Sequence, residues 1–374
     1  MSSGIIAAIL SFGNIILASV NVIIGFSLLA YILAHNYHSS VARAFCALMA
    51  LTTIVYIVDI SMTEVTAPRA ANAWLRLQWV GIAFVPAAYF HFSDALLRTT
   101  GDISRWRRLG VMLTYSVGLI AFVMVAASDL IVDGVSQKAD IYHLEAGPWF
   151  WLFAVYYLFT AASGWFNILR ARERCLTSTS RRRMSYLMLA FIAPGIGAFP
   201  YLLIPTTAEY FSPTMISVLT LASNLGVALM TVVIGYIVAY QGVLLPDRVV
   251  KHNLIHYLLR GPLVAILVII IMLALPKVEH ILGLPRDMVV VVAVAGSVVL
   301  MQVVISVSKP AIDRLIYRQD RREIAWIQSL DQRLLTTADL EQLLENTLIS
   351  LCDLLRTPSG FVVTMQGAAP SIRV

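Results

Sequence analysis

With 374 residues, of which 59% are hydrophobic and only 13% charged, this chain is too apolar for a soluble globular protein, where about a quarter of the residues are charged. Its apolar residues form runs of about 20, the length of a membrane-spanning helix, and do not alternate with polar residues as in a membrane β-barrel. The net charge of +6 does not indicate nucleic-acid binding, because the basic residues cluster in short segments between the runs. The sequence therefore predicts an all-α integral membrane protein.

Nine apolar runs follow one another, at about 5–34, 43–62, 75–97, 109–130, 148–169, 184–205, 214–240, 261–275 and 288–307. The first seven predict a helical bundle within residues 1–240, and the last two predict a membrane hairpin within residues 261–307. Residues 241–260 between them carry a basic or His residue at every fourth position from Arg248 to Arg260. This spacing is typical of an amphipathic helix on the inner membrane surface.

Lys and Arg residues are unequally divided between two sets of loops. The loops at 35–44, 98–108, 170–183 and 241–260 contain 14 of them, whereas the alternate loops contain 5. Because basic loops stay on the cytoplasmic side, the N-terminus is predicted outside and the C-terminus inside. Cys46, Cys175 and Cys352 then face the cytoplasm, where free thiols are expected.

The residues after the last run change in character. Residues 308–335 predict a polar connecting helix, and Ile327, Leu330 and Leu334 lie on one seam of it. This seam is shorter than the three or four heptads typical of a coiled coil, so pairing with a second copy is only one interpretation. Residues 336–374 predict a further helix at 337–355 and a short strand at 361–365. Membrane spans followed by a connecting helix are typical of a signal relay.

The third apolar run carries a pattern of its own. Residues 74–92 read WLRLQWVGIAFVPAAYFHF, which resembles the third helix of the seven-helix sensor region at the N-terminus of bacterial histidine kinases. The resemblance covers about residues 5–240 and implies a multi-pass protein of the bacterial cytoplasmic (inner) membrane. Residues 339–365 resemble the first helix and strand of a GAF domain, so residues 336–374 are interpreted as an incomplete GAF-like segment.

The resemblance implies a sensory, signal-transducing module that relays a ligand- or membrane-derived signal to a cytosolic output absent from this chain. The alternative is an accessory or structural subunit of a larger membrane complex derived from such a sensor. Enzyme activity is not expected, because the cytosolic helices contain no His to accept phosphate and the chain has no glycine-rich ATP-binding boxes. The expected partners are the lipid bilayer, an unknown small ligand, and a second copy or other membrane subunits. No nucleic acid and no cofactor are expected.

Polar residues inside the apolar runs are the candidate ligand-binding residues, because burying them in a bilayer is costly. Asp59 lies near the outer end of the second run, and Gln78 and Trp79 lie near the outer end of the third. These three residues could line a pocket open to the outside, or Asp59 could simply reach interfacial water. Asn21 and Asn224 are further candidates, although such residues more often hydrogen-bond between helices.

His91 and Asp94 form a second candidate group near the cytoplasmic end of the third run. They are three residues apart and therefore share one face of a helix. They could relay protons, or they could stabilise helix packing as a polar pair. No metal site is expected, because His252 and His256, although spaced for a shared ligand, have no Cys or carboxylate beside them.

Overall fold

The computed structural model describes residues 2–138, 141–175, 178–192 and 212–240, together with short segments at 257–258, 261–271, 295–299, 301, 303–305, 344–345, 348–349, 352, 359–361, 363–366 and 369–372. The chain forms two compact units, Met1–Met301 and Gln302–Val374. The predicted connecting helix at 308–335, with Ile327, Leu330 and Leu334, lies outside the described residues. The amphipathic segment at 241–260 does so as well, apart from Tyr257 and Leu258.

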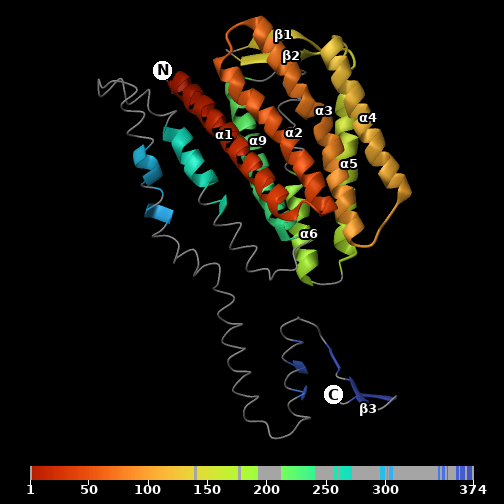
Figure 1. Cartoon of the computed structure of the whole chain (residues 1–374). Helices are drawn as coiled ribbons and strands as arrows, with labels where there is room; N and C mark the ends of the chain where they lie inside the picture. The colour runs from red at the N-terminus through yellow and green to blue at the C-terminus, as the bar shows by residue number, and fades with distance from the viewer. Residues whose placement is uncertain are drawn as a thin grey trace. The chain divides into compact units, whose positions relative to one another are not determined.

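The first unit is a bundle of long helices (Figure 1). They are α1 (Ser2–Asn36), α2 (Ser40–Ser61), α3 (Pro68–Thr99), α4 (Arg105–Ala127), α5 (Phe150–Glu173), α6 (Ser178–Ala190) and α9 (Pro213–Tyr240), with a 3-10 turn, η1 (Met62–Glu64), after α2. Among the described residues, six helices, all of these except α6, are long and apolar enough to cross a membrane. The chain is therefore a multi-pass membrane protein.

Nine spans were predicted, and the described residues account for part of them. The first five runs and the seventh correspond to the six long helices, and α6 covers the beginning of the sixth run. Shorter apolar helices at Pro262–Ile271 and Ala295–Ile305 lie within the eighth and ninth runs. The total of nine spans remains a prediction.

Local sequence explains where several helices begin and end. Ser39 precedes α2, and its hydroxyl accepts a hydrogen bond from the Ala42 amide at 3.5 Å, as a helix N-cap does. Pro68 opens α3, where its missing N–H costs nothing. Pro86 lies inside α3, and the helix continues past it to Thr99. Gly101 adopts a φ of 83°, a left-handed conformation that favours glycine and turns the chain towards α4.

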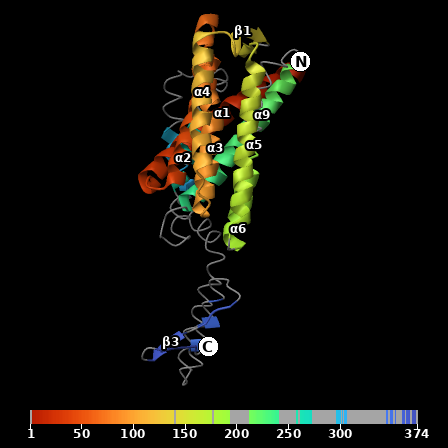
Figure 2. The ribbon, with the colours of Figure 1, turned by 90° about the vertical axis from the view of Figure 1, so that its right-hand side faces the viewer.

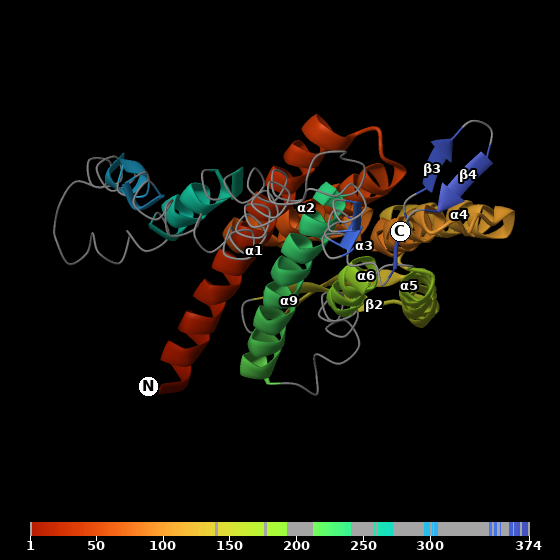
Figure 3. The same cartoon turned by 90° about the horizontal axis from the view of Figure 1, so that it is seen from below.

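Helix α3 is the central element of the bundle. It packs against α2, α4 and α5, while α1 packs against α2 and α9. Figure 2 shows α4 and α5 running along the bundle beside α3, and Figure 3, a view from below, shows α1 and α9 lying close together. Helix α3 has 32 residues and is therefore about 48 Å long, so it extends from one end of the bundle to the other.

A β-hairpin covers one end of the helices (Figure 1). Strand β1 (Val132–Lys138) pairs antiparallel with β2 (Ile141–Ala146), and the register shifts between Val132 and Val135. The sequence predicted an all-α fold with a plain loop here, and this detail was wrong. The apolar residues Ile131, Val132 and Leu144 of this region are buried in a cluster with side chains of α3, α4 and α5, which explains why the hairpin is ordered.

The second unit contains a short antiparallel pair of strands, β3 (Val363–Gln366) and β4 (Ala369–Ile372). The strand predicted at 361–365 overlaps β3. A hairpin of this size does not distinguish a GAF domain from other α/β folds, so the GAF-like interpretation of residues 336–374 stays a prediction.

Candidate functional site

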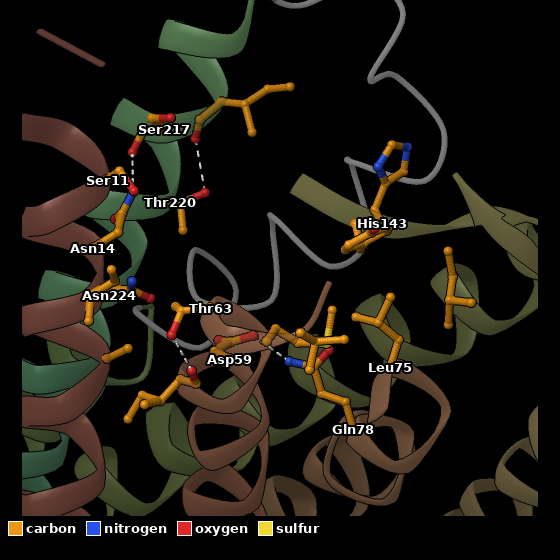
Figure 4. Close-up of a pocket in the computed structure, with 18 of the residues that line it drawn as sticks. Ser11, Asn14, Asp59, Thr63, Leu75, Gln78, His143, Ser217, Thr220 and Asn224 are labelled. Carbon is orange, nitrogen blue, oxygen red and sulfur yellow. Dashed lines mark hydrogen bonds between the residues drawn. The ribbon is translucent and has the colours of Figure 1, made fainter. Parts of the chain in front are cut away.

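A cavity of about 450 Å³ lies at the hairpin end of the bundle, between α1, α2, α3, α9 and the β1–β2 hairpin (Figure 4). Its size falls within the range of about 300–1,000 Å³ that is usual for small-molecule sites. The lining residues are Ser11, Asn14, Ile15, Ala18, Asp59, Ile60, Met62, Thr63, Val65, Leu75, Gln78, Trp79, Ile82, Val132, Tyr142, His143, Leu144, Ile216, Ser217, Thr220 and Asn224. Residues from both ends of the polypeptide segment 1–240 thus meet at one site.

Asp59 supplies a carboxylate to the cavity wall near the end of α2. The Gln78 amide donates a hydrogen bond of 2.5 Å to Asp59 Oδ1, and the same amide nitrogen lies 3.3 Å from the Val55 carbonyl oxygen. Gln78 is buried, whereas Asp59 is half-buried. The amide therefore fixes the orientation of the carboxylate at the cavity wall.

Trp79 forms part of the apolar wall. It is buried, and its ring lies 4.8 Å from the ring of Phe153 and 6.4 Å from that of Phe150, both on α5. These contacts hold the indole against the bundle, because aromatic rings at such distances attract each other in tilted and edge-to-face arrangements. Leu75, Ile82 and other aliphatic side chains complete a surface suited to a hydrocarbon group.

Three asparagines connect α1 to α9 along the bundle. The side-chain amides of Asn14, Asn21 and Asn36 donate hydrogen bonds to the carbonyl oxygens of Ser217, Asn224 and Val238, at 3.1, 3.0 and 3.2 Å. Each donor pairs further along α9 as it lies further along α1, so the two helices run parallel. Such bonds hold helices together in apolar surroundings, where water does not compete for the amide.

The Asn14 carbonyl oxygen remains available to the cavity. Its Nδ2 donates to the Ser217 carbonyl, which can only accept, so the nitrogen and not the oxygen of the amide faces Ser217. The Asn14 Oδ1 atom is buried and has no hydrogen-bond partner among the described residues. An unpaired acceptor of this kind is costly unless a ligand or water completes it.

Hydroxyl groups in the lining are also biased towards accepting. Thr63 Oγ1 donates to the Ile60 carbonyl at 2.7 Å, and Thr220 Oγ1 donates to the Ile216 carbonyl at 2.9 Å. Each hydroxyl has one hydrogen, so after this bond only its lone pairs can face a ligand. Figure 4 shows Asn14, Thr220 and Asn224 on one side of the cavity and Gln78, Leu75 and His143 on the other, with Asp59 between them.

The hairpin supplies the remaining wall through Tyr142, His143 and Leu144 of β2. The Tyr142 hydroxyl donates a hydrogen bond of 2.8 Å to the Thr66 carbonyl, in the segment between η1 and α3. Leu144 is buried beneath the hairpin, and His143 is half-buried. The hairpin is therefore tied to the segment that follows Asp59.

A second polar cluster lies at the opposite end of α3. The Asp94 side chain is completely buried, with Arg107 Nε of α4 at 3.0 Å from its Oδ1 atom. Arg98 of α3 forms an ion pair with Asp94 Oδ2, although the two groups are not oriented for a hydrogen bond. His91 faces α4 instead, with Nδ1 3.4 Å from the Tyr115 hydroxyl. His91 and Asp94 share a face, but His91 contacts Tyr115 whereas Asp94 contacts the two arginines, and these contacts do not support a direct polar pair.

The loop between α3 and α4 extends the cluster towards α5. Asp102 forms ion pairs with Arg107 at 3.0 Å, with Arg170 at 3.3 Å and with Arg174. Together with Asp94, these contacts join the ends of three helices. We refer to Asp94, Arg98, Asp102, Arg107, Arg170 and Arg174 as the arginine–aspartate network.

The sequence model described as the N-terminal 7TM region of histidine kinase matches residues 17–238, which is more than half of the chain. The chain belongs to this family. No curated protein matches it. The matched residues of the 7TM region contain all of α2 to α6, most of α1 and α9, and therefore nearly the whole cavity lining and the arginine–aspartate network. The family indicates a membrane sensory module.

The structure of the 7TM region places four of the five predicted ligand-binding residues in one lining, namely Asp59, Gln78, Trp79 and Asn224. Asn21 lies outside the lining, because it is seven residues, or about 10 Å of helix, beyond Asn14, and its amide bonds to α9. Sequence reasoning missed Thr63, Ser217, Thr220 and the hairpin residues as parts of the site, whereas Asn14 lies in the lining. Asn14 carries the same signal as Asn21, a polar residue in an apolar run.

The arginine–aspartate network favours the ionised form of the Asp102 carboxyl. A hydrogen bond from Arg107 is the main factor that lowers the pKa of the Asp102 carboxyl, and the charges of Arg107, Arg170 and Arg174 add to it. A carboxyl with a lowered pKa contributes stability above its ordinary pKa and loses it only as the pH falls through the lowered value. Asp102 therefore remains ionised, and its ion pairs intact, throughout the neutral and mildly acidic range.

The described residues contain no group of three or more His, Cys, Asp or Glu that could hold a metal ion. Cys46 and Cys175 are buried free thiols, and Cys352 is a half-buried one.

Proposed function

We propose that the 7TM region binds a small ligand in the cavity and relays its occupancy along α3 and α9 towards a cytosolic output, without itself catalysing a reaction. The observation that carries this proposal is that four helices and the hairpin share one cavity. Because α1, α2, α3 and α9 all contribute lining residues, a ligand that binds one relative arrangement of these helices more tightly shifts the population towards it.

Two features support transmission to the far end. The three asparagine contacts make α1 and α9 a coupled pair from Asn14 to Val238. Helix α3 carries Gln78 and Trp79 at the cavity and Asp94 in the arginine–aspartate network at its other end. A displacement of α3 at the cavity therefore has a specific polar structure to disturb about 24 Å away along the helix, given 1.5 Å per residue from Gln78 to Asp94.

Filling the cavity with a side chain should mimic a ligand. Spin labels at Leu33→Cys on α1 and Glu173→Cys on α5, both exposed positions, report the distance between these helices at the end away from the cavity. We expect Thr220→Phe, which places a ring in the cavity, to shift the distance distribution measured by double electron–electron resonance in a cysteine-free background.

The matched control is Val218→Phe, a substitution two residues away on α9 at an exposed position outside the lining. It adds a similar ring to the outer surface and should leave the distribution unchanged. If Thr220→Phe also leaves it unchanged while the protein remains folded, cavity occupancy is not coupled to the far end and the sensory proposal is wrong.

We also propose that the hairpin end faces outward in the bacterial cytoplasmic membrane and that the arginine-rich end faces the cytoplasm, because of the 14-to-5 division of basic residues between the loops. Native Cys175 is a poor reporter of this topology, since burial raises the pKa of its thiol and shields it. Exposed Gln137 on the hairpin and Glu173 at the end of α5 are better positions.

In a cysteine-free background, we expect Gln137→Cys to react with an impermeant maleimide in intact cells. Glu173→Cys should react only in inverted vesicles. The parental cysteine-free protein serves as the blank. The opposite pattern would place the cavity on the cytoplasmic side.

A further inference from the structure

The polar groups of the cavity have an uneven balance of donors and acceptors. Asp59 contributes a carboxylate, and Asn14 contributes a buried carbonyl oxygen without a partner among the described residues. Thr63 and Thr220 present lone pairs, because each donates its hydroxyl hydrogen to a nearby backbone carbonyl oxygen, that of Ile60 or Ile216. Most of the oxygen atoms that face the cavity can therefore only accept hydrogen bonds.

The charge of the lining has one sign. Asp59 is the only acidic residue among the lining residues that the structure describes, and none of these is Lys or Arg. The Gln78 amide holds this carboxylate in a fixed orientation at the cavity wall. A negative charge in a partly buried site favours a cationic ligand.

The remaining surface is apolar. Trp79, Leu75, Ile82 and Leu144 lie on the α3 and hairpin side, and Ile15, Ile60 and Ile216 lie on the other helices. A ligand that satisfies both parts of the cavity carries a hydrogen-bond donor with positive charge at one end and a hydrocarbon or aromatic group at the other.

We infer that the cavity recognises a primary ammonium group attached to an apolar body, with Asp59 as its counter-ion and Asn14 Oδ1 and the threonine hydroxyls as further acceptors. This inference rests on the proposed function and specifies the ligand class. The same ammonium chemistry occurs in soluble amines and in the headgroup of phosphatidylethanolamine. Both sources match the acceptor-rich lining, and both offer N–H donors, which a quaternary ammonium lacks.

The test uses the full chain in phosphatidylcholine nanodiscs, whose headgroups have no N–H donor, and 2-phenylethylammonium as the probe in isothermal titration calorimetry. We expect the wild type to bind the probe at least about tenfold more tightly than its N,N,N-trimethyl derivative or 2-phenylethanol. The first comparison removes the N–H donors and keeps the charge, and the second removes the charge.

Asp59→Asn should weaken binding by about 10- to 100-fold, the loss typical of a charge-assisted hydrogen bond. Thr220→Val, which is similar in shape and removes only a hydroxyl, should weaken it by a few-fold and guards against loss through misfolding. Asp129→Asn is the matched control, because Asp129 is an exposed carboxylate outside the lining. It should bind the probe as the wild type does.

Adding phosphatidylethanolamine to the nanodiscs distinguishes the two sources. If the lipid headgroup occupies the cavity, the lipid competes with the probe in the wild type but not in Asp59→Asn, and if a soluble amine is the ligand, the lipid has no effect. The inference is overturned if the wild type does not bind the probe, if the trimethyl derivative binds equally well, or if Asp59→Asn leaves binding unchanged. Binding without any change in the spin-label distances would instead contradict the sensory role and leave the ligand class standing.

Discussion

Asp94→Asn should destabilise the bundle by about 3 kcal/mol, because it leaves the charges of two arginines without their buried carboxylate. The Asp94 side chain has no exposed surface, while the Arg107 and Arg98 side chains are 15% and 34% exposed. Breaking a buried ion pair costs about 3–5 kcal/mol, and the partial exposure of Arg98 favours the lower end of that range. Asparagine has nearly the same shape, so the loss reports the charge and not a cavity.

Asp129→Asn tests whether exposure decides the outcome. Asp129 also forms an ion pair with an arginine, Arg76, but its side chain is 64% exposed. Arg76 keeps hydrogen bonds to the Val125 and Ser128 carbonyls at 2.5 and 3.3 Å after the substitution. Exposed ion pairs contribute about 0–1 kcal/mol, so this variant should be almost as stable as the wild type.

Thermal unfolding in detergent, followed by fluorescence-detected size-exclusion chromatography, compares the two variants. Asp94→Asn should lower the midpoint by roughly 6–12 °C, and Asp129→Asn should lower it by a few degrees at most. In the Arg107→Gln background, Asp94→Asn should cost less than it does alone, because the two groups interact directly. Equal midpoints for Asp94→Asn and wild type would show that the arginine–aspartate network does not stabilise the fold.

The membrane helices could be predicted from sequence because hydropathy and bilayer thickness determine them almost alone. Six of the predicted runs coincide with long helices. Their boundaries differ where polar residues continue a helix beyond the apolar run. Helix α3 begins at Pro68 instead of residue 75, since Pro68 initiates it and Asn72 and Arg76 hydrogen-bond along its surface at 3.2 Å.

The hairpin could not be predicted by the same argument. Its strands belong to neither a long apolar run nor a regular alternation, because the register shift between Val132 and Val135 interrupts the period of two. What stabilises it is burial of Leu144 and Val132 against α3, α4 and α5, a tertiary contact that no local pattern contains. The lining residues Tyr142 and His143 were missed for that reason.

The candidate site was partly predictable because a carboxylate or amide is rare within an apolar run. Asp59, Gln78 and Asn224 stood out in this way, and the structure brings them into one lining. Thr63 and Thr220 did not stand out, since threonine is common in membrane helices and usually bonds its own backbone, as both do here. Arg98 and Arg107 were read as topology signals, although they also neutralise Asp94.

Gly81→Ala should destabilise the contact between α2 and α3 by about 1–3 kcal/mol, the usual cost of overpacking. A Cβ atom on Gly81 would lie 2.3 Å from Val55 Cγ2 and 2.7 Å from the Leu51 carbonyl oxygen. The second of these is a backbone atom of α2, so a change of rotamer cannot relieve it and the two helices must move apart. The gain of up to about 1 kcal/mol in helix propensity for Gly→Ala offsets only part of this cost.

The separation of α2 from α3 also reaches the cavity. Gly81 lies one turn from Gln78, and Val55 lies one turn from Asp59, so the same displacement lengthens the Gln78–Asp59 hydrogen bond. Gly81→Ala should therefore lower the unfolding midpoint and also weaken binding of 2-phenylethylammonium, although residue 81 does not line the cavity. A purely local packing defect would change the midpoint alone.

Gly110→Ala is the matched control on α4. The added Cβ atom would lie 3.5 Å from Phe90 Cε1, an ordinary van der Waals distance, and the position is likewise inside a membrane helix. We expect this variant to equal or exceed the wild type in unfolding midpoint and to bind the amine normally, because it gains helix propensity without a clash. If Gly81→Ala behaves as Gly110→Ala does, then α2 and α3 are not in close contact at this point. The Gln78–Asp59 hydrogen bond would then not depend on the close packing of these two helices.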